Sequence, residues 1–275
     1  MESSPSTSFL VRHEFLLRRL HSLSGLIPVG AYMIVHLLTN SLTMMGTAPF
    51  QNAVYQIHAL GPALPLVEWG FIFIPILFHA IFGVVIIFTG RSNVAHYGYA
   101  ANYRYVLQRI TGMIALVFIF LHVFHLHGWF HFDAWLESVA KPLGGARFSP
   151  YNAGSTLALA FQSSFLIPLL YAIGVLSCIF HLANGIWTMG ITWGVWINPS
   201  AQRRAGWICL ALGLGLSGVS VGALMGPLRI DPSDAKAQED EMYELRTQEG
   251  TVLPDEHKRA GGHTAETAEL EQPQR

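Results

Sequence analysis

Hydrophobic residues in this chain form five long uninterrupted blocks instead of alternating with polar residues. The blocks carry almost no formal charge and lie at Leu23–Met45, Val67–Thr89, Val106–His127, Ser164–Met189 and Ala205–Gly226. A helix rises about 1.5 Å per residue, so about 20 apolar residues cross a hydrocarbon core of about 30 Å. The pattern therefore predicts an all-α integral membrane protein, a bundle of five transmembrane helices.

Composition narrows the class of protein further. Hydrophobic residues make up 52% of the 275 residues and charged residues only 12%, about half the share in a typical soluble domain. A soluble enzyme, a secreted disulfide scaffold and a nucleic-acid binder are thereby excluded for the whole chain. Cys178 and Cys209 lie singly in apolar blocks, which predicts neither a disulfide nor a zinc site. The N-terminus lacks the pattern of a cleaved signal peptide.

Charge divides the chain into two parts. Residues 1–228 hold ten Lys and Arg against five Asp and Glu, and residues 229–275 hold six against twelve. Eight of these ten positive residues lie in the N-terminal segment and around the second and fourth loops between the blocks, and two lie in the third loop. Positive residues favour the cytoplasmic side, so the N-terminus and the second and fourth loops are placed in the cytoplasm. We therefore expect a cytoplasmic segment at 1–22, a membrane domain at 23–228 and an acidic tail at 229–275. The tail would lie outside and be largely disordered, with a candidate short helix at Asp234–Gln248.

Four histidines lie deep in four different blocks: His36, His79, His122 and His181. A polar side chain is expensive in a membrane and marks function. From the helical rise and the alternating helix directions, His36 and His122 share the outer half and His79 and His181 the inner half. Two imidazoles facing each other across a bundle are suitable axial ligands for haem iron, which predicts two haems. His125 is the main competitor of His122, and a transporter or channel that relays protons is the alternative reading.

Several sequence strings, taken in order, resemble one family of membrane proteins. They are FLLRRLHSLSGLIPVG, HLLTN, FIPILFHAIFGV, VLQRITG, LHVFH and GVLSCIFHLANGIW, within residues 15–200. The chain resembles the di-haem cytochrome b (b558-type) anchor subunits of succinate:menaquinone oxidoreductases and fumarate reductases. The resemblance implies two b haems, with His36 and His122 as ligands of the outer, distal haem and His79 and His181 as ligands of the inner, proximal one.

The resemblance also implies partners and a location. The chain would anchor a cytoplasmic flavoprotein subunit and an iron–sulfur subunit in the bacterial inner membrane, in contact with lipid, and pass electrons to menaquinone. It has no dinucleotide-binding fingerprint and no cysteine run for a cluster, so succinate would be oxidised on the partners. The cytochrome b anchor of a fumarate reductase, a hydrogenase or a formate dehydrogenase stays open as an alternative.

Polar residues near the two membrane faces are further candidates. Haem propionates are anionic, and donors for those of the inner haem would be Arg18, Arg19, His21, Ser22 and Arg109; the arginines also suit positive-inside anchoring. Glu68 is the one acid at the outer end of a span. It is either a water-exposed interfacial carboxylate or a proton carrier at a quinone site beside the outer haem. Some fumarate-reducing relatives have a glutamate two residues before the last ligand; Ile179 stands there, which favours succinate oxidation.

Overall fold

All the regular secondary structure in the computed structural model, which describes residues 12–92 and 94–261, is helical. Within these ranges there is no strand, only a single bridge between Ser149 and Asn152. Five segments are long and apolar enough to cross a membrane: Glu14–Met45, Gly61–Thr89, Ala100–His127, Leu166–Thr192 and Pro199–Met225. Five candidate spans therefore lie where the sequence predicts them. The first of these segments begins at Glu14, so it includes part of the segment expected to precede the membrane domain.

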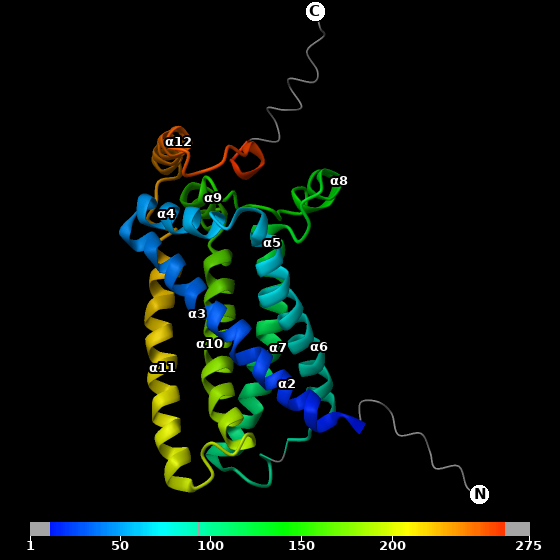
Figure 1. Ribbon diagram of the computed structural model, residues 1–275. Helices are drawn as coiled ribbons and strands as arrows, with labels where there is room; N and C mark the ends of the chain where they lie inside the picture. The colour runs from blue at the N-terminus through cyan, green and yellow to red at the C-terminus, as the bar shows by residue number, and fades with distance from the viewer. Residues whose placement is uncertain (1–11, 93, 262–275) are drawn as a thin grey trace, which may run out of the picture. The chain divides into compact units, whose positions relative to one another are not determined.

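Two of the five spans are interrupted helices, and three are continuous (Figure 1). The first span consists of α2 (Glu14–Leu26), α3 (Pro28–Ser41) and a 3₁₀ turn (Leu42–Met45), and the break falls where Pro28 lacks a backbone donor. The second consists of α5 (Leu64–Val67), a π-helical stretch (Glu68–Phe73) and α6 (Ile74–Thr89). The continuous spans are α7 (Ala100–His127), α10 (Leu166–Thr192) and α11 (Pro199–Met225).

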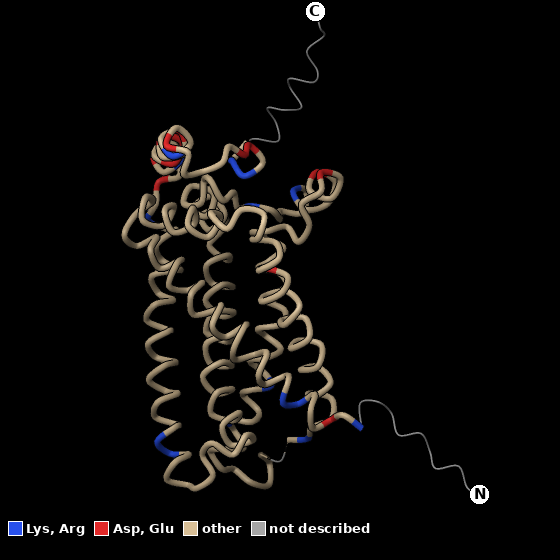
Figure 2. The backbone as a smooth tube through the Cα atoms, in the orientation of Figure 1, with Lys and Arg blue, Asp and Glu red and all other residues tan. Residues whose placement is uncertain are grey.

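The chain divides into two compact units, and each takes a part of every span. The first unit comprises Met1–Ile34, Pro65–Leu116 and Leu176–Leu216, and the second comprises Val35–Leu64, Val117–Val175 and Ser217–Arg275. Within the first unit α2 packs against α6. Charged residues are rare between the ends of the apolar helices (Figure 2), as expected for segments that face hydrocarbon.

Three helices outside the spans pack on one another in the second unit: α4 (Thr47–His58), α9 (Ala153–Gln162) and α12 (Pro232–Gln248) (Figure 1). We call these helices, together with the segment that follows α12 to residue 261, the cap. The side chain of Asp231 accepts hydrogen bonds from the backbone N–H groups of Ser233 and Asp234, which fixes the start of α12. The helix expected at Asp234–Gln248 is therefore present. Residues 262–275 lie outside the described residues.

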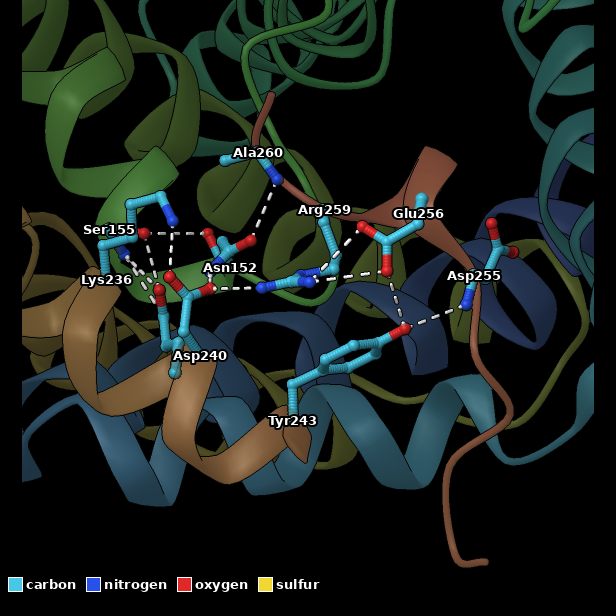
Figure 3. Close-up of polar contacts among 10 residues, drawn as sticks. Asn152, Ser155, Lys236, Asp240, Tyr243, Asp255, Glu256, Arg259 and Ala260 are labelled. Carbon is cyan, nitrogen blue, oxygen red and sulfur yellow. Dashed lines mark hydrogen bonds and ion pairs between the residues drawn. The ribbon is translucent and has the colours of Figure 1, made fainter. Parts of the chain in front are cut away.

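Composition suggested a largely disordered tail, whereas the polar side chains of the cap form hydrogen bonds and ion pairs. Glu239 is fully buried and accepts hydrogen bonds from the backbone of Gly154 at 2.5 Å and from the hydroxyl of Ser155 at 2.5 Å. These donors lie at the N-terminus of α9, where free N–H groups and the helix dipole favour an anion. Asp240 accepts from Asn152 at 3.0 Å and pairs with Arg259 at 3.0 Å (Figure 3).

Candidate functional site

The structure brings the four deep histidines together in two pairs, one in each unit. In the first unit, His79 on α6 and His181 on α10 have ring centroids 6.0 Å apart and ring planes at 89°. In the second, His36 on α3 and His122 on α7 have centroids 5.8 Å apart and planes at 77°. All four side chains are half-buried. These are the pairs that the depth argument predicted.

The spacing within each pair suits a metal held between two imidazoles. With metal–nitrogen bonds of about 2 Å on each side, the two ring centroids would lie roughly 6 Å apart. Within the described residues, no group of three or more His, Cys, Asp and Glu side chains could hold a bare metal ion. Each pair supplies two nitrogen ligands, so an ion bound there would need its other ligands from a bound group. A haem macrocycle supplies four.

The inner pair, His79 and His181, is oriented by backbone carbonyl groups. Nδ1 of His79 lies 2.9 Å from the carbonyl oxygen of His21, and Nδ1 of His181 lies 3.0 Å from that of Gln108. A carbonyl oxygen only accepts, so Nδ1 is the protonated nitrogen in both rings. The lone pair of each ring is then on Nε2, the nitrogen that remains for a metal.

Two glycines make room for these rings. A methyl group added at Gly25 on α2 would lie 2.2 Å from Cε1 of His79. One added at Gly112 on α7 would lie 2.8 Å from Cε1 of His181. Carbon atoms that are not bonded do not approach this closely, so only glycine allows the two backbones to pass the rings at these distances.

His21, expected among the propionate donors, lies against a histidine of the inner pair. Its ring stacks on His79 with the centroids 4.0 Å apart and the planes at 9°. Nδ1 of His21 is buried without a hydrogen-bond partner, although a buried polar atom normally has one. The residue therefore contributes its carbonyl and its ring to the surroundings of His79, and its free nitrogen is available to a bound group.

Tyr171 on α10 contacts both histidines of α7 in the second unit. Its hydroxyl lies 2.7 Å from Nδ1 of His125 and 3.3 Å from Nδ1 of His122. Because a phenol both donates and accepts, it can serve both rings. His122 is the residue whose ring faces His36, whereas His125 is held through Tyr171. Tyr171 was not among the residues predicted from the sequence. It is one of nine tyrosines, and no local pattern distinguishes it from the others.

The other expected propionate donors lie in the first unit and support helix ends there. Arg18 pairs with Glu14 at 2.7 Å, and the guanidinium of Arg19 lies 5.3 Å from the ring centroid of Trp193. Ser22 accepts a hydrogen bond from the Trp193 indole at 3.0 Å. Arg109 donates to the carbonyl of Ile86 at 3.0 Å, near the end of α6, and its Nε is buried without a partner. Their role toward a haem stays a prediction.

Glu68 begins the π-helical stretch of the second span. Its carboxylate is near enough to Tyr32, also in the first unit, to interact with it electrostatically. Single π-helical turns inside α-helices occur frequently at functional sites. A role of Glu68 in proton transfer stays a prediction.

A comparison with curated proteins finds a relative of known name. The succinate dehydrogenase cytochrome b558 subunit of Bacillus subtilis (strain 168) is 36% identical to this chain over 211 residues. The match covers 77% of this chain and 96% of the relative. No family model matches the chain.

Proposed function

Because the chain belongs to the family of succinate dehydrogenase cytochrome b558 subunits, we propose that it binds two b haems and passes electrons from succinate to menaquinone. Its family and its five apolar helices make it a membrane cytochrome b subunit. The observation that carries the proposal is the presence of two facing histidine pairs, at 5.8 and 6.0 Å, within those apolar helices.

Each proposed haem would have its own set of protein ligands. His79 and His181 would hold the inner haem, and His36 and His122 the outer one. Arg18, Arg19, His21, Ser22 and Arg109 would serve the propionates of the inner haem, since all five lie in the unit that contains His79 and His181. When bound, the haems supply one-electron carriers. The carbonyl contacts of the two inner rings keep Nδ1 protonated, so Nε2 would be the nitrogen left to bind the iron.

The span ends and loops that carry the positive side of the sequence would face the cytoplasm. They hold eight Arg residues, namely Arg12, Arg18, Arg19, Arg91, Arg104, Arg109, Arg203 and Arg204. We place the flavoprotein and iron–sulfur subunits on this side, where arginine suits a protein interface. The cap would then lie outside, and the membrane would be the bacterial inner membrane.

The proposed reaction moves charge across the membrane. Succinate loses two electrons and two protons on the cytoplasmic partner, and menaquinone takes up two electrons and two protons near the outer face. Glu68 would carry the outer protons. Electron movement toward the positive side releases about 2.3 kcal/mol per charge per 100 mV, or about 4.6 kcal/mol for two electrons. Ile179 stands where an intramembrane glutamate could otherwise move compensating protons.

The test is to express the chain with its flavoprotein and iron–sulfur partners, purify the complex and measure haem per chain. We expect two b haems, reducible by succinate and reoxidised by a menaquinone analogue. A complex that assembles and oxidises succinate with an artificial acceptor, but holds no haem, would refute the proposal. One haem per chain would refute the assignment of one of the two pairs.

A further inference from the structure

One face of α7 packs against α10 around His181, in the first unit. Arg104, Gln108 and Gly112 are spaced four residues apart, which places them on one side of the helix. Gly112 allows the close approach of His181 described above. The other two residues carry polar side chains, and both point to polar groups of α10.

Gln108 and His181 bind each other twice. The ring Nδ1 of His181 donates to the backbone carbonyl of Gln108 at 3.0 Å, and the side-chain amide of Gln108 donates to the backbone carbonyl of His181 at 3.0 Å. The bond from the Gln108 amide joins the Gln108 side chain to the backbone of His181. The bond from the His181 ring to the Gln108 carbonyl therefore does not depend on helix packing alone. The position of the acceptor for the His181 ring is thereby set.

Asn184 connects Gln108 to Arg104. It lies one turn after His181 and is 3% exposed. Its amide nitrogen donates to the side-chain oxygen of Gln108 at 2.7 Å, and its amide oxygen accepts from Nε of Arg104 at 2.7 Å. The guanidinium of Arg104 in turn lies 3.7 Å from the ring centroid of Trp187, also on α10. No buried side-chain polar atom of Arg104, Gln108 or Asn184 lacks a hydrogen-bond partner, as buried networks require.

We propose that Arg104, Gln108 and Asn184 are positioning residues that fix the ring of His181 and thereby set the properties of the inner haem. This inference rests on the proposed function, because it assigns His181 as a haem ligand. The chemistry involved is that of outer hydrogen bonds that orient a metal-bound imidazole and raise its basicity.

The direction of the effect follows from that basicity. A strong bond from Nδ1–H to a carbonyl makes the imidazole a better donor to iron, which favours the oxidised, more positive state. Loosening the contacts that hold the Gln108 carbonyl weakens this bond. The inner haem should then be easier to reduce, so its midpoint potential should rise. The outer haem has ligands in the other unit and should keep its potential.

A purely structural role for the network is the competing explanation, since polar side chains also join helices in membranes. That role would affect assembly or thermal stability but would leave the potential of a bound inner haem unchanged. The midpoint potentials of the two haems therefore separate the two explanations.

The experiment compares Asn184→Leu with Thr188→Val in the assembled complex, by redox titration and by the spectrum of each haem. Leucine has nearly the shape of asparagine but makes none of its hydrogen bonds. Thr188 lies one turn further along α10, and its hydroxyl bonds only to the carbonyls of Asn184 and Gly185 in its own helix. We expect Asn184→Leu to change the redox equilibrium of the inner haem at least tenfold toward the reduced state, or about 59 mV for one electron. Thr188→Val should change neither haem.

Selective loss of the inner haem in Asn184→Leu would also support the proposal, because the outer haem reports that the chain has folded. If the variant fails to assemble, Arg104→Lys decides: it keeps the positive charge but removes the Nε donor, and it should shift the inner haem in the same direction by less. Unchanged potentials in an assembled Asn184→Leu complex, or in Arg104→Lys, would overturn the proposal. Absence of haem from the unmodified complex would refute the proposed function itself.

Discussion

Replacing Gly25 with alanine should displace His79 and remove the inner haem while leaving the outer one. The added methyl would lie 2.2 Å from Cε1 of His79, whereas ordinary contacts begin at 3.4 Å. The ring or the helix must therefore move by about 1.2 Å, the difference between these two distances. A metal ligand must be held to about 0.5 Å of its productive position. The displacement exceeds that tolerance more than twofold.

A second glycine makes this prediction quantitative. At Gly112 the added methyl would lie 2.8 Å from Cε1 of His181, so the required movement is about 0.6 Å. Gly112→Ala should therefore weaken or perturb the inner haem less than Gly25→Ala does. Gly218→Ala is the matched control, because an added methyl there meets nothing within 4 Å. Alanine is favoured over glycine in helices by about 1 kcal/mol, so none of the three changes should destabilise its helix through propensity.

The assay is haem content and the reduced-minus-oxidised spectrum of the purified complex. We expect one haem per chain in Gly25→Ala and two in Gly218→Ala, with Gly112→Ala retaining more of the inner haem than Gly25→Ala. Two haems with unchanged spectra in Gly25→Ala would show that the geometry around His79 is not as described. Loss of the outer haem alone would show that Gly25 acts on the other pair.

Further predictions concern ligation, protons and the cap. Substituting His122 should remove only the outer haem and substituting His181 only the inner one, whereas loss of a haem in His125→Ala but not in His122→Ala would reverse the ligand assignment. Glu68→Gln should slow quinone reduction at least severalfold in a quinol-formation assay without changing haem content; full activity would remove Glu68 from the proton path. An uncoupler should slow the succinate-to-menaquinone step in respiring cells, and an unchanged rate would argue against charge movement across the membrane. Burial raises the pKa of Glu239 above its ordinary value of 4.5, although hydrogen bonds from Ser155 and Gly154 oppose this. The stability that this group contributes is thus present below pH 4.5 and lost as the pH rises through the higher, folded-state pKa. Glu239→Gln should reduce the pH dependence of hydrogen exchange in α12, measured after correction for intrinsic exchange rates. An unchanged pH profile in this variant would count against a contribution of Glu239 to stability.

The spans and the pairing of the histidines could be predicted from sequence because both depend on length. An apolar block of sufficient length has one stable arrangement in lipid, and a fixed helical rise converts residue number into depth. His36 and His122 therefore face each other in one unit, and His79 and His181 in the other. Depth alone therefore indicates these pairs, even where the neighbouring helix faces are unknown.

The groups that orient the histidines could not be predicted in the same way. The acceptors for the inner rings are backbone carbonyls of His21 and Gln108, and every residue has a carbonyl, so no residue type marks the position. The four-residue spacing of Arg104, Gln108 and Gly112 in α7 was the available signal, since it places polar and small residues on one face of an apolar helix.

The cap shows why composition misjudged the C-terminal part of the chain. A polar, acidic segment with few large apolar residues usually lacks a core. Here the carboxylate of Glu239 binds the N-terminus of α9, more than 80 positions earlier in the chain. Tyr243 packs near Tyr151, with ring centroids 5.4 Å apart. Partners so distant in sequence leave no local pattern, so a folded cap and a solvated tail look alike in composition.

In the proposed function, each histidine pair holds one haem iron from both sides. Electron paramagnetic resonance of the oxidised, purified complex tests it most directly, because an iron with two imidazole ligands is six-coordinate and low-spin, and one that lacks a ligand becomes high-spin. We predict two low-spin ferric signals in equal amounts, one lost on substitution of His79 or His181 and the other on substitution of His36 or His122. A high-spin signal in the unmodified complex, or a single substitution that abolishes both low-spin signals in an assembled complex, would contradict the account.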